Sequence, residues 1–345
     1  MPGAWAAALR RPSRNLYPSL YPSRLSLKRP KRQRWLQMPA PDGKIRVLAL
    51  GGGGIRGVIS ARILARIEEI TKRPIYQSFD MICGTSTGGI LSAALTMPSP
   101  LTANACLALY LSHGKEIFSS SAWRRFISLG GNTGPKYDGV GLKKVLQATY
   151  GEYRLEQALI PTFLTAYAIE KRAPIFFKSW VQAQGGTPIV DVAMATSAAP
   201  TYFPPAKVGN DWYCDGGVIN NNPALSGVIE ACMKYGVHTK DCVVVSIGTG
   251  VNQAAIPHEK AAGWGNLGWV QPLIGIFMDG VSDLTHYQMA DLMPSDQYLY
   301  LQPYLEEKNA SMDATDSTNL ADLVLAAQST LASNQERLVA LCNRL

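Results

Sequence analysis

The stretch 47-VLALGGGGIRGVISARIL-64 joins an apolar run to four consecutive glycines and then to a segment with a helical pattern. The apolar residues predict a buried strand over 45–50. A helix is predicted over 55–70, because isoleucines recur there at spacings of three and four: Ile59, Ile63, Ile67 and Ile70. The glycines between the two elements leave backbone N–H groups free to face an anion. The pattern leaves open whether that anion is a resident phosphate or a charge formed during a reaction.

The same order of strand, glycine turn and helix repeats directly downstream. A short strand is predicted over 79–83 and a helix over 90–96, with 84-GTSTGG-89 between them. Two such units in succession are typical of a parallel sheet with crossover helices. Further patterns predict strands over 161–170, 174–179 and 243–247, and helices over 101–118, 141–150, 191–197, 281–293 and 319–341. We therefore predict an α/β protein with a mostly parallel sheet.

The pattern Gly84-x-Ser86-x-Gly88 places a serine on a tight turn from strand to helix. The flanking glycines remove Cβ atoms that would clash in such a turn, and the turn holds the hydroxyl above the sheet edge. The N-terminus of the following helix favours negative charge near that hydroxyl. The pattern is loose, and the same residues also suit a helix N-cap beside a glycine turn. On its own it indicates a nucleophile without establishing one.

A nucleophilic serine needs a base, because a free hydroxyl is a poor nucleophile at neutral pH. The histidines stand in helix-end, turn or loop contexts without a catalytic pattern; they are His113, His238, His258 and His286. Asp215 is the other candidate for the base. It follows a short apolar segment that includes Trp212 and Tyr213, and it precedes two glycines. Asp-Gly is, however, also a common turn dipeptide. If both strand–loop–helix units share one parallel sheet, their loops meet at one edge. The amides of the loop 52–54 could then face the oxyanion of a bound carbonyl.

Three motifs together resemble the patatin-like phospholipase family. They are 52-GGGIRG-57, 84-GTSTGG-89 and 215-DGG-217. The likeness extends through 134-GPKYDG-139 and 197-SAAPTYFPP-205, which are similar to plant patatin segments, and it covers roughly residues 44–250. The fold that this resemblance implies is a three-layer α/β/α arrangement with a mostly parallel central sheet.

The resemblance also implies a Ser–Asp dyad, with Ser86 as the nucleophile and Asp215 as the base that activates it. The implied oxyanion hole consists of the glycine loop, with Arg56 tightening the loop or adding positive charge; its amides are those of Gly52, Gly53 and Gly54. Family members are lipid acyl hydrolases that act on phospholipids or other acyl lipids. They work through an acyl-enzyme and use neither a metal nor a cofactor, so we expect none here.

Several features around the implied site stay open. Many family members carry Asp just before the three glycines, where this chain has Gly51, and the departure puts the rigidity of the loop in doubt. Tyr202, Phe203 and Trp212 are candidates for the walls of an acyl-chain pocket, although core packing explains them equally well. The segments 119–139 and 252–275 are candidates for a lid or a membrane contact.

Three other functions compete with ester hydrolysis. The Gly52-x-Gly54-x-x-Gly57 pattern also fits a dinucleotide-binding oxidoreductase, with Asp80 as the ribose-binding carboxylate. Asp80 opens its strand, however, whereas such a carboxylate normally closes one. A storage or scaffold protein would keep the fold without activity. Some bacterial patatin-like enzymes are antiviral effectors switched on by cyclic nucleotides, but no nucleotide site is identifiable here.

The net charge of +8 is concentrated at the N-terminus. Residues 1–41 hold nine of the 33 Lys and Arg residues and no Asp or Glu, which leaves 24 basic and 25 acidic residues elsewhere. The body is nearly neutral, so we expect no nucleic-acid partner. Residues 1–41 are rich in Pro, Ser and Tyr and are predicted as a disordered basic tail. This tail is either an over-extended translation start, with Met38 as the true start, or an arm attracted to anionic lipid.

Residues 42–345 are predicted as one hydrolase domain, because no second hydrophobic unit stands apart. No apolar run reaches the length of a membrane span. The six cysteines show no CxxC spacing, which is typical of buried thiols in a reducing compartment. We therefore expect a cytoplasmic protein that contacts a membrane surface transiently, during catalysis on an acyl lipid.

Overall fold

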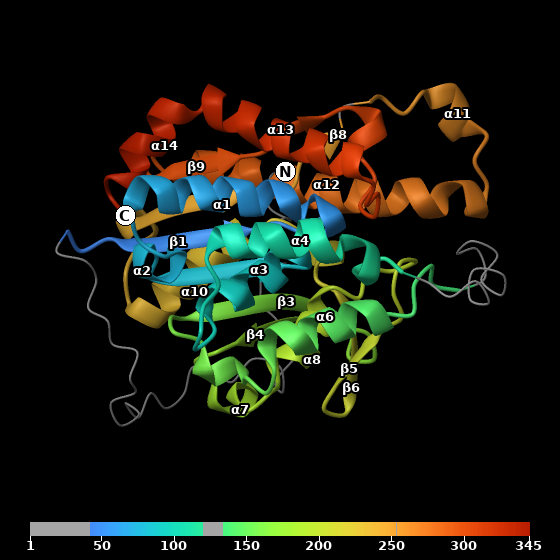
Figure 1. The fold of residues 1–345 in the computed structure, drawn as a ribbon. Coiled ribbons are helices and arrows are strands. Elements are labelled where there is room, and N and C mark those ends of the chain that lie inside the picture. The colour runs from blue at the N-terminus through green and yellow to red at the C-terminus, as the bar shows by residue number, and fades with distance from the viewer. Residues whose placement is uncertain (1–41, 120–133, 253) are drawn as a thin grey trace, which may run out of the picture. The chain divides into compact units, whose positions relative to one another are not determined.

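The computed structural model describes residues 42–119, 134–252 and 254–345, whose helices and strands are labelled in Figure 1. The basic segment 1–41 and most of the connection predicted over 119–139 lie outside these described residues. The disordered tail and the single domain over 42–345 therefore stay predictions.

The centre of the described fold is a mixed sheet of eight strands, in the order β5-β6-β3-β2-β1-β7-β9, with β4 paired to β3. Its strands are β1 (Ile45–Leu50), β2 (Met81–Thr85), β3 (Thr162–Ala168), β4 (Ala173–Lys178), β5 (Ala206–Val208), β6 (Asp211–Asp215), β7 (Cys242–Ile247) and β9 (Tyr298–Leu301). The pairs β3–β2, β2–β1, β1–β7 and β7–β9 are all parallel, which confirms the predicted mostly parallel sheet. β8 (Val251–Asn252) and β10 (Tyr304–Leu305) form a separate parallel pair.

The long helices lie on both faces of this sheet. They are α1 (Gly57–Thr71), α3 (Thr87–Thr96), α4 (Ala103–Ile117), α6 (Val140–Tyr150), α8 (Ile189–Thr196), α10 (Ala224–Tyr235), α12 (Asn266–Leu292), α13 (Ser317–Ser333) and α14 (Gln335–Cys342). Short helices are α2 (Ile75–Ser78), α7 (Gln182–Gly185), α9 (Gly217–Asn220) and α11 (His258–Ala262). Within the described ranges, no helix combines the length and the apolar character that crossing a bilayer requires.

The predicted elements correspond to observed ones, with three informative differences. The helix predicted over 281–293 is the second half of α12, whose first half contains Gly268, Pro272 and Gly275, residues that read as a loop because each disfavours a helix interior. The helix predicted over 319–341 is two helices, since the chain leaves the helical conformation at Asn334, where α13 ends and α14 begins. The short strands β5 and β9 and the helix α10 were not predicted.

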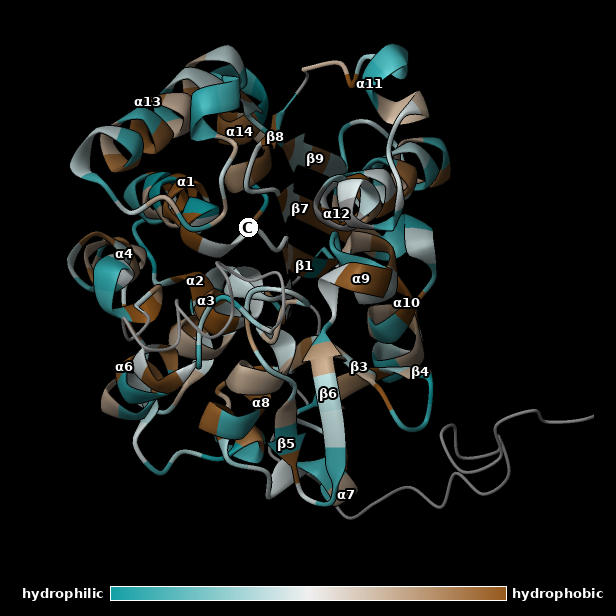
Figure 2. Cartoon of the chain, turned by 90° about the vertical axis from the view of Figure 1, so that its right-hand side faces the viewer, coloured by the Kyte–Doolittle hydropathy of each residue, from teal (hydrophilic) through white to brown (hydrophobic). Residues whose placement is uncertain are grey.

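Both faces of the sheet are buried, and β1 shows how. Leu48 and Leu50 point into a core that includes residues of α1, α3, α4 and α13. Val47 and Ala49 point into a second core that includes residues of α10 and β7. A strand covered by helices on both sides needs apolar residues at every position, which explains the unbroken apolar run that opens the motif. Figure 2 shows the resulting three layers, with α1, α4 and α13 on one side of the strands and α10 and α12 on the other, as predicted.

The strand β3 brings two distant parts of the chain together. Its first half pairs with β2, where Thr85 lies opposite Thr165, and its second half pairs with β6, where Asp215 lies opposite Ala166. β4 pairs with nearly the whole length of β3, so β2 and β6 must share the remaining edge. β2 is parallel and β6 antiparallel to β3, so their C-terminal ends meet head to head at residues 165 and 166. The residues that end these two strands are therefore neighbours in space.

The turn between β2 and α3 requires glycine because backbones pass very close there. A Cβ atom at Gly84 would overlap the carbonyl of Gly88, and one at Gly88 would overlap the carbonyl of Leu50 in β1. These close approaches let α3 start directly after Ser86, three residues before the predicted start.

We expect Gly88→Ala to lower the free energy of unfolding by about 1–3 kcal/mol, because the added methyl group forces β1 and α3 apart. Gly186→Ala is the matched control, since Gly186 has φ −70° and open space around it. Urea unfolding followed by circular dichroism measures both variants. Equal stability of the two would contradict the close approach.

Candidate active site

Ser86 lies on a strained turn at the end of β2. Its backbone has φ 55° and ψ −125°, a left-handed conformation that is unfavourable for any residue with a Cβ atom. The N–H of Ser86 donates to Oγ1 of Thr196, at the end of α8, over 2.9 Å. The neighbouring Thr85 side chain donates to the carbonyl of Asn220 at 2.6 Å. Bonds on both sides thus stabilise the turn and hold the serine at the edge of the sheet, between β2 and α3.

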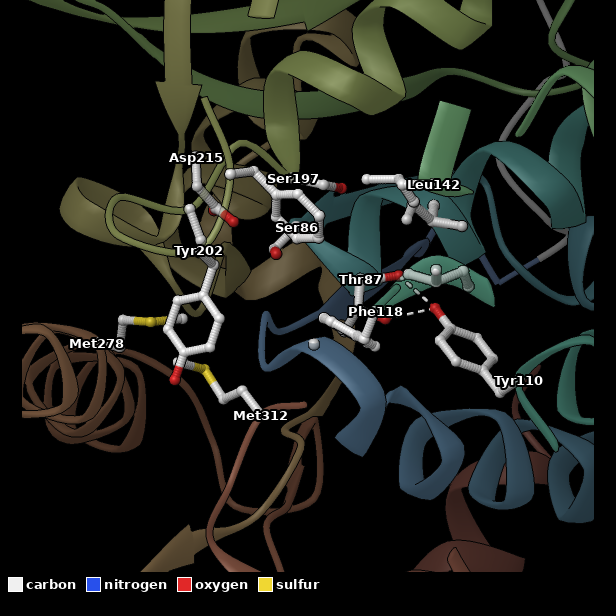
Figure 3. A pocket seen from close by; sticks show the side chains of 15 residues that line it. Ser86, Thr87, Tyr110, Phe118, Leu142, Ser197, Tyr202, Asp215, Met278 and Met312 are labelled. Atoms are coloured by element: carbon white, nitrogen blue, oxygen red, sulfur yellow. Dashed lines mark hydrogen bonds between the residues drawn. The ribbon is translucent and has the colours of Figure 1, made fainter. Parts of the chain in front are cut away.

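Asp215 is the last residue of β6 and is 2% exposed. Its backbone N–H donates to the carbonyl of Ala198 at 2.9 Å, and its Oδ1 accepts from the N–H of Gly217 at 2.7 Å. Oδ2 is buried and has no hydrogen-bond partner among the described residues. Figure 3 shows the carboxylate of Asp215 and the hydroxyl of Ser86 pointing toward each other. The free oxygen of the carboxylate is therefore available to the serine, although no well-formed hydrogen bond joins the two in this structure.

Burial raises the pKa of Asp215 from its ordinary value near 4 to about 7. The nearby Ser86 hydroxyl and the N–H of Gly217 oppose that rise, because both stabilise the charged carboxylate. A carboxylate with a pKa near 7 is a much stronger proton acceptor than an exposed aspartate, and it is still largely ionised in mildly alkaline solution. The pocket therefore contains a carboxylate whose pKa suits a proton acceptor near neutral pH.

The glycine loop follows β1 and is anchored by its backbone. The N–H of Gly51 donates to the carbonyl of Ile247 at 2.9 Å, and the N–H of Gly52 donates to that of Asn221 at 3.2 Å. The Thr249 hydroxyl donates to the carbonyl of Gly52 at 2.5 Å. The loop is thus held on both sides without an acidic side chain at position 51. The amide of Gly52, which we predicted as part of an oxyanion hole, already has an acceptor here.

The amides of Gly53 and Gly54 differ, because they donate to no acceptor among the described residues. Both residues have positive φ angles, 157° and 61°. A Cβ atom at Gly53 would overlap the side chain of Thr249, and one at Gly54 would overlap the carbonyl of Met312. Glycine is therefore required at both positions, and two free amides remain beside the Ser86 pocket, which Gly54 lines.

Arg56 is buried behind this loop. Its Nη1 donates to the carbonyl of Ala310 at 3.3 Å, and its Nε has no partner among the described residues. Burial lowers the pKa of Arg56, while the charge of Asp279 in α12 opposes that change. Arg56 thus links the loop to the 310–312 segment and places a positive charge close to it, which agrees with both roles considered for it.

The segment after Asp215 is a part of the site that sequence reasoning missed. The carbonyls of Asn220 and Asn221 accept from Thr85 and Gly52, so one short segment holds both the serine turn and the glycine loop. The Nδ2 of Asn221 also donates to Oγ of Ser282 in α12 at 3.0 Å. The three consecutive asparagines at 220–222 were a visible signal, but their contacts depend on a fold that brings three loops together.

Ser86 and Asp215 lie at one end of a pocket that encloses about 530 Å³ of space not filled by protein atoms, part of it open to solvent. Apart from these two residues, its walls are mainly apolar or aromatic. They are Gly54, Thr87, Ile90, Tyr110, Ile117, Phe118, Leu142, Ser197, Ala199, Tyr202, Phe203, Met278 and Met312. In Figure 3, the Tyr202 ring lies between the side chains of Met278 and Met312. Such walls suit an apolar ligand.

The structure bears out two of the three predicted pocket-wall residues. Tyr202 and Phe203 line the pocket, as predicted, whereas the prediction for Trp212 was wrong: its ring is 42% exposed and lies under Lys207, away from the pocket. The prediction failed because β6 alternates, so that Tyr213 and Asp215 face inward while Trp212 faces out.

Neither a histidine base nor a ribose-binding aspartate is present at this site. Of the described residues, no histidine lines the pocket. Asp80 precedes β2, at the end opposite to the glycine loop, and its carboxylate accepts from the N–H of Arg46 at 2.7 Å. Within 42–119, 134–252 and 254–345, no group of three His, Cys, Asp or Glu side chains is placed to hold a metal ion.

The two segments similar to plant patatins are joined to each other. The N–H groups of Lys136 and Tyr137 donate to the carbonyls of Thr201 and Tyr202 at 2.9 and 2.8 Å. The Tyr137 ring also packs against Phe203, with ring centroids 5.5 Å apart. These contacts place Tyr202 and Phe203 on the pocket wall.

Comparison with known proteins agrees with the motifs. The model of a family described as patatin-like phospholipase matches residues 48–228. Patatin-like protein 1 of Arabidopsis thaliana is 30% identical over 339 residues, which cover 83% of this chain and 81% of the relative. The probable inactive patatin-3-Kuras 1 of Solanum tuberosum is 30% identical over 325 residues, which cover 82% and 84%. Among solved structures, VipD from Legionella pneumophila matches with 11% identity and a TM-score of 0.43, over 86% of this chain and 67% of that chain.

The raised pKa of Asp215 predicts a pH-dependent effect on stability. The folded protein binds this proton more tightly than the unfolded chain does, so the contribution of Asp215 to folding becomes less favourable as pH rises from about 4 to about 7. We expect Asp215→Asn to raise the melting temperature at pH 8 by about 3–8 °C and to raise it much less at pH 5. Calorimetry at the two pH values measures the difference. The exposed Asp291→Asn is the control, and an equal change for Asp215→Asn at both pH values would contradict the burial effect.

Proposed function

The chain belongs to the patatin-like phospholipase family, and on that premise we propose that it hydrolyses carboxylic ester bonds of phospholipids or related acyl lipids. The observation that carries the proposal is the meeting of Ser86 and Asp215 where β2 and β6 end against β3. Two free glycine amides beside an apolar pocket complete the constellation that acyl transfer needs. The mechanism below follows from these groups.

In the first half-reaction, Oγ of Ser86 attacks the ester carbonyl carbon while its proton passes to Oδ2 of Asp215. The carbonyl oxygen becomes an oxyanion, which the amides of Gly53 and Gly54 stabilise. The tetrahedral intermediate then breaks the carbon–oxygen ester bond, and Asp215 returns the proton to the departing alcohol. Ser86 is left as an acyl ester.

In the second half-reaction, a water molecule attacks the acyl carbon and gives a proton to Asp215. Collapse of this intermediate releases the fatty acid and returns the proton to Oγ of Ser86. The amide of Gly52 stays bonded to Asn221 and supports the loop. The proposed oxyanion hole therefore has two amide donors, those of Gly53 and Gly54, where the sequence predicted three.

The pocket supports an acyl lipid as the substrate. Asp215 is the one charged residue among its described lining, and most other walls are apolar side chains. A polar or strongly charged acyl group would lose its hydration there without gaining partners, whereas a hydrocarbon chain would be stabilised by burial.

We also propose that α12 makes the transient membrane contact. Large apolar side chains are exposed along one face of this helix: Trp269, Leu273, Ile276, Phe277, Leu284 and Tyr287. Their spacings of three, four and seven residues place them on one stripe, and Met278 on the opposite face lines the Ser86 pocket. Exposed apolar stripes of this kind insert into membrane interfaces. The helix thus connects a lipid surface with the site, and a cytoplasmic location remains a prediction.

Of the three rival functions, one has an observation in its favour. One relative that is 30% identical to this chain is named as a probable inactive patatin. A storage or scaffold role without activity is therefore the second candidate. A nucleotide-activated effector stays a hypothesis from family analogy. The oxidoreductase hypothesis is disfavoured, because Asp80 lies at the wrong end of β2.

We expect Ser86→Ala to reduce fatty-acid release from mixed phospholipid vesicles by at least about a thousandfold, because the nucleophile is lost. Mass spectrometry of the products measures activity and ester position together. Ser329→Ala, which changes an exposed serine of α13, is the matched control. If wild type and Ser86→Ala release fatty acid equally, the hydrolase proposal is wrong, and if neither does, the scaffold role gains support.

We expect Phe277→Glu to weaken binding to phospholipid vesicles by about tenfold or more, since burying a charge in the interface is unfavourable. Hydrolysis of a soluble short-chain ester should stay within about twofold of wild type because Phe277 lies outside the pocket lining. Vesicle co-sedimentation measures the binding. Leu325→Glu, at an equally exposed leucine of α13, is the control. Unchanged vesicle binding together with a change in molecular mass would identify the stripe as a subunit interface instead.

A further inference from the structure

A second apolar cavity lies behind the wall of the Ser86 pocket. It comprises about 420 Å³ of space not filled by protein atoms, part of it open to solvent, and is lined by residues of α3, α4 and α6. Leu91 and Ala94 come from α3, Cys106 from α4, and Leu146 and Tyr150 from α6. We call this space the inner chamber.

The inner chamber and the Ser86 pocket share a wall. Ile90, Tyr110, Ile117 and Leu142 line both spaces, so these side chains stand between them. Three of the four are aliphatic, and rotamer changes of aliphatic side chains are fast and cost little compared with backbone movement. An acyl chain held at Ser86 can therefore extend past Ile90 and Leu142 without rearrangement of the fold.

The polar atoms of the inner chamber have partners already. The hydroxyl of Tyr150 donates to the carbonyl of Ile90 at 2.7 Å, and that of Thr149 donates to the carbonyl of Val145 at 2.8 Å. The hydroxyl of Tyr110 is bonded to Thr87. Burial raises the pKa of the Cys106 thiol to about 12, so that it is neutral. Among the described lining residues, the three hydroxyl groups are thus already bonded within the protein, and the other walls are apolar side chains that offer dispersion contacts.

Empty apolar space of this kind is unusual in a protein interior. Native cores are close-packed, and the atoms around a void lose contacts that they would make with a ligand or a side chain. Apolar cavities also stay dry and accept apolar guests. A space with these properties, one side chain away from a nucleophilic serine, is suited to a hydrocarbon chain.

We propose that the inner chamber binds the distal part of the substrate's fatty acyl chain and sets the chain length that the enzyme prefers. This inference rests on the hydrolase function proposed above and extends it to the substrate class. The carbonyl lies at Ser86, the first methylenes lie along Ile90 and Leu142, and the remainder lies between α4 and α6. Headgroup and glycerol lie on the other side of Ser86, toward Tyr202 and Met312.

The side chains between the chamber and the outer surface limit the length of the acyl chain that fits. Leu109, Val145 and Thr149 line both the chamber and a groove on the outer surface between α4 and α6. The ion pair of Lys144 with Glu116, at 2.7 Å, lies at that outer groove. The chain is therefore enclosed at its end by the side chains that separate the interior from solvent.

Two substitutions of opposite effect test this assignment. Ala94→Phe fills the chamber, whereas Leu146→Ala deepens it. The measurement is kcat/KM for a series of p-nitrophenyl esters from four to sixteen carbons. For Ala94→Phe we expect the four-carbon ester to be hydrolysed within about twofold of wild type and the sixteen-carbon ester about 15–60 times more slowly, since each methylene denied burial is worth about fourfold. For Leu146→Ala the ratio of long-chain to short-chain activity should rise.

Gln147→Phe is the matched control, because it adds a ring to the exposed side of α6 and should leave the chain-length profile unchanged. The short ester serves as an internal test of folding, together with thermal melting of each variant. If wild type, Ala94→Phe and Leu146→Ala share one chain-length profile, the inner chamber does not hold the acyl chain.

A binding measurement separates this inference from the proposed function. Titration of palmitate against a fluorescent fatty acid, in protein carrying Ser86→Ala, needs no catalysis. We expect Ala94→Phe in that background to weaken palmitate binding by about tenfold or more, and Gln147→Phe to leave it unchanged. Binding of this kind without ester hydrolysis by wild type would overturn the hydrolase proposal and keep the chamber as a fatty-acid site. Hydrolysis with palmitate binding that Ala94→Phe does not alter would overturn the chamber alone.

Discussion

The pairing register along a single edge of β3 is the constraint on which the site depends. Thr85 opposite Thr165 and Asp215 opposite Ala166 put the ends of β2 and β6 head to head. A shift of either strand by one residue would turn its side chains to the other face and separate Ser86 from Asp215. The antiparallel β6 is therefore not an accessory to a parallel sheet, because only a strand that runs against β3 can end where β2 ends.

Burial then gives the assembled groups their chemical character. Asp215 lies almost wholly out of solvent, and this desolvation raises its pKa to about 7. A solvent-exposed aspartate would keep its ordinary pKa near 4 and would be a weak base. The charged form of Asp215 is consequently unfavourable for folding, as is common for groups in functional sites. The positive φ of Ser86 is a second example of local strain held by neighbouring hydrogen bonds.

Four helices surround the site on two sides. α12 presents Met278 to the pocket and an apolar stripe to the exterior, and Asn221 bonds to its residue Ser282. α3, α4 and α6 enclose the inner chamber on the other side of Ser86. The arrangement links three properties of a lipid hydrolase through the packing of a few helices.

Much of this fold and site was predictable from local sequence. The apolar run 47–50 in β1, the spaced isoleucines of α1 and the two glycine turns predicted a parallel sheet with crossover helices, and Ser86 and Asp215 were named from their motifs. The long helix α12 was only half predicted, because its glycines and proline mask a helix that tertiary contacts stabilise. Trp212 was placed wrongly, since a strand shorter than six residues does not reveal which face is buried.

The sequence by itself determined the chemistry that is present: a serine on a glycine-flanked turn, an aspartate before two glycines, and a loop of bare amides. These depend on residue identity and short spacing, which local steric rules already govern. Only the tertiary structure decided which amides are free, because Asn221 takes that of Gly52 and leaves those of Gly53 and Gly54. It also decided that the base is buried and that a second apolar space adjoins the site. The contact of Asn221 with Gly52 joins segments more than a hundred residues apart, and the second apolar space is formed by three separate helices. No short pattern encodes contacts of either kind.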